Sequence, residues 1–204
     1  MVCALSSHIS DAAGINILNI SSTLQQKLLA SYFSQDGIEY SIGRIPMASC
    51  DFSTSPYSYD DHDGDFQMVN FSLAKEDFHL KIPLLLSAVK MSRRNLTFFG
   101  SPWAAPAWMK TNGKMQGAGQ LKGVAGDKYH KAWALYFAKF IKAYEDNGVK
   151  IWGLTVENEP STGFIKGYVV MCEAAETFFI GMIHFVSYLN KCQNAATSAK
   201  KLCS

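Results

Sequence analysis

The sequence predicts an α/β fold in which helices alternate with the strands of a parallel sheet. Three segments carry apolar residues at helical spacing, and a short apolar run follows each of them. At 204 residues and 48% hydrophobic, the chain can bury one globular core, which excludes a disordered or collagen-like protein. Alternation of this kind requires right-handed crossovers and a parallel sheet, either doubly wound or closed into a barrel.

The pattern begins with a divided helix, which is followed by a strand and a long loop. Residues 11–37 carry apolar side chains every three or four positions, with a break near Ser21 and a glycine at the end, and so predict a helix in two pieces. The apolar run 40–47 closes at a proline and predicts the first strand. The polar, acidic residues 51–65 predict a long loop after it.

Two further helix and strand pairs follow this loop. Residues 76–92 predict a helix in which Pro83 must lie in the first turn or cause a kink, and the run 96–103 predicts the second strand. Apolar residues three or four apart make 129–144 the clearest helix of the chain. The third strand, 150–156, is apolar at nearly every position, as expected when both of its faces are covered.

Residues that a core disfavours follow each predicted strand. Asp51 comes after the first strand, Trp103 ends the second, and Asn158 and Glu159 follow the third. The carboxyl ends of parallel barrel strands share one face, where active sites are assembled. A doubly wound fold also binds ligands there, but the glycines at 117–123 miss the dinucleotide-binding spacing by one residue. A dinucleotide-binding protein is therefore disfavoured.

The side chains at these positions have the chemistry of a sugar site. Partial burial and a neighbouring carboxylate would raise the pKa of Glu159 and suit it to general acid catalysis. Asn158 offers a donor and an acceptor to a sugar hydroxyl, Trp103 offers a flat ring to a pyranose, and Asp51 can accept hydrogen bonds from two vicinal hydroxyls. A turn cap at Asp51 and a core position for Trp103 are the structural alternatives, and the sequence leaves both open.

Composition excludes several other classes of function. The net charge of +2, from 19 basic and 17 acidic residues, disfavours a nucleic-acid partner. His62 and His130 lack metal-ligand spacing, and the acidic run 60–65 fails the calcium-loop pattern and is interpreted as a solvated loop. The five cysteines are scattered and predict neither a disulfide scaffold nor a zinc ribbon. We therefore expect no metal and no other cofactor.

Targeting signals are weak in this sequence. No apolar stretch is long enough for a membrane span, and no signal peptide is visible at the start. Three Asn-x-Ser/Thr sequons, at Asn19, Asn70 and Asn95, would be used only on the secretory path, and they hint at secretion.

Four segments together resemble the lysosomal acid β-glucosidases, or glucosylceramidases, of glycoside hydrolase family 30: residues 31–53, 70–84, 101–113 and 152–164. The resemblance implies a (β/α)8 TIM barrel, of which residues 1–172 form about the first half. It also implies retaining hydrolysis of the β-glucosyl bond of glucosylceramide, in the lysosome. Residues 173–204 match nothing in the family and are expected to form a divergent helical tail.

The resemblance also assigns roles to residues. Glu159 matches the family's acid/base, Asn158, Trp103 and Asp51 match residues that line its glucose subsite, and Tyr168 resembles a tyrosine at the rim of the site. The family's nucleophile lies on a later strand, and its N-terminal strand with a glycine-rich turn has no match here. We therefore expect a truncated chain that is inactive on its own, or, alternatively, a non-catalytic sugar- or lipid-binding remnant.

The partners that the resemblance implies are a β-glucoside and a lipid surface. Glucosylceramide or another β-glucoside is the expected substrate. A saposin-type activator and an acidic membrane lipid surface are the expected partners, and no nucleic acid is expected.

Overall fold

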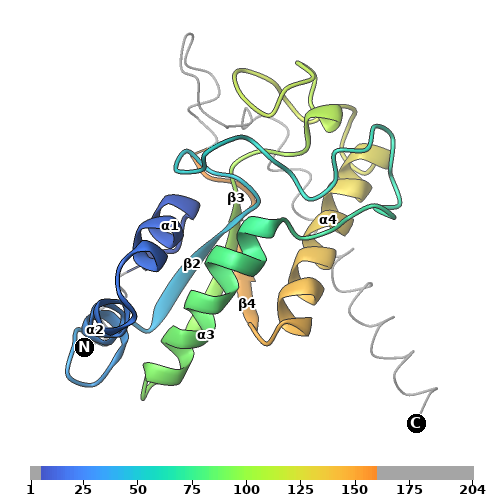
Figure 1. Cartoon of the computed structure of the whole chain (residues 1–204). Coiled ribbons are helices and arrows are strands. Elements are labelled where there is room, and N and C mark those ends of the chain that lie inside the picture. Colours follow the sequence, from blue (N-terminus) through green and yellow to red (C-terminus); the bar gives the residue numbers. More distant parts are fainter. Residues whose placement is uncertain (1–5, 160–204) are drawn as a thin grey trace. The chain divides into compact units, whose positions relative to one another are not determined.

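The computed structural model describes residues 6–159, and Figure 1 shows helices and strands alternating along them. The elements in chain order are β1 (Ser6–His8), α1 (Asp11–Asn19), α2 (Ser22–Phe33), β2 (Ile42–Met47), the π turn η1 (Asp77–Lys81), α3 (Ile82–Met91), β3 (Thr97–Pro102), the 3₁₀ turn η2 (Ala107–Met109), α4 (Lys128–Asp146) and β4 (Ile151–Leu154). The chain divides into two compact units. The described residues of the first unit are 6–58, 73–103 and 143–158, and those of the second are 59–72, 104–142 and 159.

The first unit is built on a parallel sheet of four strands in the order β1-β2-β3-β4. β2 and β3 pair over their full length, from Ile42 opposite Thr97 to Met47 opposite Pro102. The predicted parallel sheet is therefore confirmed. The strand β1 was not predicted, because the sequence pattern begins with a helix. Its residues, Ser6–His8, are all polar and give no apolar signal; parallel pairing with β2 makes them a strand.

The first predicted helix is divided, as expected, into α1 and α2. Ser10 and Ser21 cap the two pieces, since each hydroxyl accepts a hydrogen bond from a backbone N–H three residues later. α1 packs closely against Leu80 of the π turn η1 at Gly14, where an added Cβ would come within 2.7 Å of the Cβ of Leu80. α2 ends at Phe33 and not at the glycine of the pattern, and a turn joins it to β2.

Pro83 lies in the first turn of α3, which confirms one of its two predicted positions. The five residues before α3 form a π turn, in which the backbone N–H of Ile82 bonds to the carbonyl of Asp77. Asp77 and Lys81, at the two ends of this turn, are both fully buried. The wider turn therefore carries two charged side chains into the interior of the first unit.

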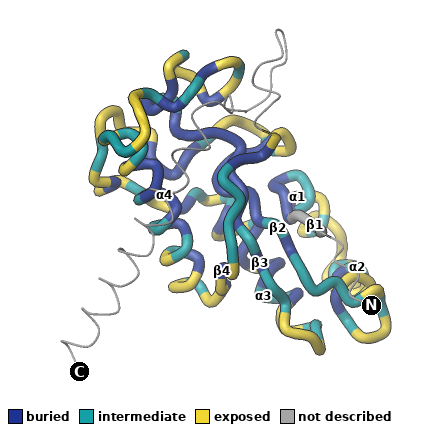
Figure 2. The backbone as a smooth tube through the Cα atoms, turned by 180° about the vertical axis from the view of Figure 1, so that it is seen from behind, coloured by how far each residue is buried: buried dark blue, intermediate teal, exposed yellow. Residues whose placement is uncertain are grey.

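Burial rises toward the carboxyl ends of β2 and β3, where the tube in Figure 2 is coloured as buried. β4 differs from its prediction, because only one of its four residues is buried. Ile151 is buried, whereas the side chain of Trp152 is 74% exposed. An apolar run therefore does not establish that both faces of a strand are covered, since a large aromatic residue can also lie in solvent.

The second unit has an aromatic core formed by α4 and the loop residues that precede α3. Tyr136 and Phe140 of α4 stack on Tyr59, with ring centroids 5.6 and 6.2 Å apart. The Tyr136 hydroxyl also accepts a hydrogen bond from the backbone N–H of Tyr59. The predicted helix is confirmed, and Gly148, with φ of +83°, follows its end. Among the described helices, none has the length and apolar character needed to cross a membrane.

Candidate active site

In the first unit, side-chain hydrogen bonds join Arg44 in the middle of β2 to the end of β3 and to the residues that follow β4. Arg44 of β2 donates through Nη2 to Ser101 Oγ of β3 at 2.7 Å and to Asn158 Oδ1, beyond β4, at 2.6 Å. The Thr155 hydroxyl donates to the same Ser101 oxygen. The backbone N–H of Asn158 bonds to the carbonyl of Pro102, so the chain after β4 continues beside the end of β3. These contacts hold Asn158 at the sheet's carboxyl edge.

Arg44 also determines the orientation of the Asn158 amide. A guanidinium only donates, so the atom that faces it must be the amide oxygen. The amino group of Asn158 therefore lies on the other branch of the amide. Asn158 is buried, so rotation of its side chain would break a charge-assisted hydrogen bond away from bulk water.

Trp103 brings Asp51 to the same edge of the sheet. The indole Nε1–H of Trp103 donates to Asp51 Oδ2 at 3.1 Å, while the Arg44 guanidinium lies 4.5 Å from the centre of the Trp103 ring. Trp103 is only 4% exposed and Asp51 is exposed. Trp103 is thus a core aromatic and at the same time the partner of a carboxylate that faces solvent.

Asp51 lies in a tight turn whose ends are joined by hydrogen bonds. The backbone N–H of Ser53 bonds to the carbonyl of Cys50, and the Ser53 hydroxyl accepts from the Cys50 N–H at 3.0 Å. The side chain that caps this turn is therefore that of Ser53, while the Asp51 carboxylate bonds to the indole. Burial raises the pKa of the Cys50 thiol, so this cysteine stays protonated at neutral pH.

Glu159, assigned to the second unit, is exposed, which corrects the partial burial that we expected from its sequence setting. Its backbone is left-handed, with φ of +46°, a conformation that non-glycine residues rarely adopt and that clusters at functional positions. Tyr168 lies outside the described residues, as does the boundary between residues 172 and 173 and the tail after it.

The described residues contain no group of three or more side chains that could hold a metal ion. His130 pairs with the carboxylate of Asp127 at 3.1 Å, at the start of α4. The interpretation of residues 60–65 as a solvated loop is wrong at Asp60, which is only 2% exposed. His62, two residues later, does face solvent. The Trp108 indole donates to the Asp60 carbonyl, and burial raises the pKa of the Asp60 carboxyl.

Comparison with known proteins gives a family and a fold. Residues 2–180 match the model described as the glycosyl hydrolase family 30 TIM-barrel domain. The lysosomal acid glucosylceramidase of Mus musculus is 53% identical over 163 residues, which cover 80% of this chain and 32% of that protein. Putative glucosylceramidase 4 of Caenorhabditis elegans is 49% identical over 154 residues, covering 76% and 30%.

Among solved structures, SrfJ from Salmonella typhimurium matches with a TM-score of 0.72 at 29% identity, covering 83% of this chain and 36% of that one. The predicted partial (β/α)8 barrel is therefore confirmed. The chain spans about a third of the length of the curated relatives it matches.

Proposed function

Because the chain belongs to the glycosyl hydrolase family 30 TIM-barrel domains, we propose that it is part of a glycoside hydrolase of the glucosylceramidase type. The relatives at 53% and 49% identity are named as a glucosylceramidase and a putative glucosylceramidase. Their names support glucosylceramide, or another β-glucoside, as the substrate class. The chemistry proposed is retaining hydrolysis, in which one carboxyl serves as acid/base and a second serves as nucleophile.

One observation carries this proposal: Arg44 contacts two of the three residues proposed to hold the sugar and reaches the third through one of them. Its guanidinium donates to Asn158 and lies over Trp103, and Trp103 holds the Asp51 carboxylate. In the proposed complex, Asp51 accepts hydrogen bonds from two neighbouring hydroxyls and Asn158 donates to a third oxygen. A neutral polyol with a fixed hydroxyl pattern fits such a set better than a charged ligand.

Glu159 directly follows Asn158 along the chain, and we propose it as the acid/base. It would first protonate the oxygen of the departing group and then remove a proton from the attacking water. Asn158 is anchored by Arg44, so the peptide that leads into Glu159 starts from a fixed position. No carboxylate of this chain is assigned as the nucleophile, which the resemblance places on a later strand.

The proposed sugar site is tested by titrating the 204-residue chain with methyl β-D-glucopyranoside and following its side-chain N–H signals by NMR. We expect saturable shifts of the Trp103 indole and Asn158 amide signals. Asp51→Ala should weaken binding by about tenfold or more, because it removes charged hydrogen bonds to the sugar. Phe52→Ala is the matched control, since Phe52 is the next residue and is 58% exposed. Absence of any shift at millimolar glucoside would contradict the proposal.

Release of glucose from a β-glucoside tests the catalytic assignment separately. We expect no release from this chain alone, because retaining hydrolysis needs a second carboxylate as nucleophile and none of this chain is assigned that role. The measurement is free glucose after prolonged incubation of the purified chain, with Glu159→Gln as the comparison. Release that disappears in Glu159→Gln would show that the nucleophile is among these 204 residues.

A lysosomal location, a saposin-type activator and an acidic lipid surface are further parts of the proposal. The mouse relative is named a lysosomal enzyme, which supports the location. Exposure of all three sequon residues, Asn19, Asn70 and Asn95, is compatible with passage through the secretory path.

A further inference from the structure

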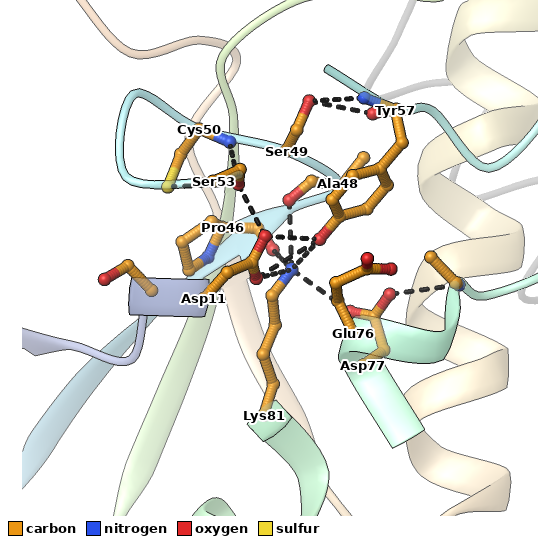
Figure 3. A network of polar contacts seen from close by, with 12 residues as sticks. Asp11, Pro46, Ala48, Ser49, Cys50, Ser53, Tyr57, Glu76, Asp77 and Lys81 are labelled. Carbon is orange, nitrogen blue, oxygen red and sulfur yellow. Dashed lines mark hydrogen bonds and ion pairs between the residues drawn. The ribbon is translucent and has the colours of Figure 1, made fainter. Parts of the chain in front are cut away.

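Lys81 is fully buried and contacts both ends of the loop that follows β2, residues 48–57. Figure 3 shows its ammonium at the centre of a polar network. Nζ donates to the carbonyls of Pro46 and Ala48, at 3.2 and 3.0 Å, and to the Tyr57 hydroxyl, at 3.1 Å. The loop formed by residues 48–57 is therefore fastened at its start and at its end by a single side chain.

Two buried carboxylates hold the Lys81 ammonium in place. Asp77 Oδ1 lies 3.3 Å and Asp11 Oδ1 lies 3.5 Å from Nζ, and both carboxylates are almost completely buried. The Tyr144 hydroxyl donates to Asp77 at 2.6 Å, and the Tyr57 hydroxyl lies 3.0 Å from Asp11 Oδ2. A buried ammonium needs such partners, because an unpaired charge away from water is strongly destabilising.

The start of the loop requires an external constraint. Ala48 has φ of +61°, in the left-handed region that residues with a Cβ rarely occupy. The carbonyl of this strained residue is one of those that accept from Lys81 Nζ. The ammonium therefore holds the backbone in a conformation that the alanine would not adopt by preference.

The same cluster reaches the turn that carries Asp51. Asp11 Oδ2 accepts a hydrogen bond from the Ser53 hydroxyl at 2.5 Å, and the backbone N–H of Ala12 donates to the Phe52 carbonyl at 2.9 Å. The residues on the C-terminal side of Asp51 are thus tied to the first turn of α1. Asp11, which makes one of these ties, is itself fixed by the Lys81 ammonium.

We propose that Lys81 is a positioning residue for the sugar contact of Asp51, a role that rests on the proposed function. Lys81 is buried and does not touch the ligand. It orders the 48–57 loop so that the Asp51 carboxylate stays on the Trp103 indole. Loss of the ammonium lets Asp51 leave the indole and weakens sugar binding.

The test compares the 204-residue chain with Lys81→Met, which keeps the length of the side chain and removes its charge. The first readout is the hydrogen exchange rate of the Trp103 indole N–H, assigned among the four tryptophans with Trp103→Phe. The second readout is the affinity for methyl β-D-glucopyranoside. We expect exchange to accelerate and affinity to fall by about tenfold, the effect of losing one charge-assisted hydrogen bond.

Lys110→Met is the matched control. Lys110 is the other fully buried lysine among the described residues, and its Nζ donates to the Met115 carbonyl in the second unit. This variant also removes a buried ammonium, but it should leave the Trp103 indole signal unchanged. A general loss of stability would change the indole signal in both variants, whereas positioning of Asp51 predicts a change in Lys81→Met alone.

Ser53→Ala keeps the inference testable if Lys81→Met does not fold. Ser53 is only half-buried, and the change removes its hydrogen bonds to Asp11 and to the Cys50 N–H while leaving the ion pairs in place. Ser53→Ala should accelerate the exchange of the Trp103 indole N–H, and Ser53→Thr, which restores a hydroxyl, should reverse this effect.

The two readouts separate failure of the inference from failure of the proposed function. Unchanged indole exchange and unchanged glucoside affinity in a folded Lys81→Met or Ser53→Ala variant would overturn the positioning role, while the sugar site would stand. An unaltered chain that binds no glucoside would overturn the proposed function and, with it, the sugar role of Lys81. Faster indole exchange together with weaker binding supports both.

Discussion

Replacing Asp77 with alanine is expected to lower the free energy of unfolding of the chain by about 3–5 kcal/mol. Asp77 is fully buried, and its carboxylate lies 3.3 Å from the equally buried ammonium of Lys81. The change removes one of two anions that compensate this charge and also the acceptor of two hydrogen bonds, one from the Tyr144 hydroxyl and one from the backbone N–H of Ala74. Urea unfolding at neutral pH, followed by circular dichroism, measures the difference.

Two further variants separate the ion pair from the hydrogen bond. Tyr144→Phe removes only the hydroxyl and should cost about 1 kcal/mol, the usual net value of a single hydrogen bond. Asp77→Asn keeps an acceptor of the same shape without the charge, and it should fall between Tyr144→Phe and Asp77→Ala. Equal losses in Asp77→Ala and Tyr144→Phe would assign the effect to the hydroxyl and contradict a role for the ion pair.

The Lys81 cluster also shows where sequence reasoning ends. Residues 76–92 predict a helix, and lysine side chains are rarely buried in proteins unless they are paired. Its burial depends on Asp11 and on the carbonyls that follow β2, which are distant in the sequence. The π turn that carries both Asp77 and Lys81 inward leaves no periodic signal in so short a segment.

The main elements were predictable because their apolar spacing is local information. The two pieces of the first helix, α4 and the parallel strands all follow from spacing and from residues that end an element. β1 was not predictable in this way, because three polar residues become a strand only by pairing with β2. The exposure of Trp152 was missed because hydrophobicity does not reveal which face of a strand is covered.

The sequence predicts which residues meet at the edge of the sheet, but it does not predict the hydrogen bonds between them. Asp51, Trp103 and Asn158 each lie at or after the end of a predicted strand. Because the carboxyl ends of parallel strands meet at one edge, these residues are expected to lie together. The structure adds the hydrogen bond between Trp103 and Asp51 and the central place of Arg44. These contacts depend on strand register, which the sequence pattern does not specify.

Replacing Phe140 with alanine is expected to lower the free energy of unfolding by about 3–5 kcal/mol. Phe140 is fully buried in the second unit, where its ring stacks on Tyr59 at a centroid distance of 6.2 Å. Removal of the ring loses its transfer free energy and leaves a cavity between side chains that relax only partly. Urea unfolding again provides the measurement.

Trp152→Ala is the matched control for the Phe140 variant, because it truncates a larger aromatic residue that is 74% exposed. Its effect should stay within about 0.5 kcal/mol, as for most surface substitutions. Phe140→Leu, which keeps most of the apolar volume, should cost less than Phe140→Ala. If the two alanine variants lost similar free energy, the stability of this chain would depend on the aromatic face of β4 as much as on the α4 core, contrary to the burial that the structure assigns to each.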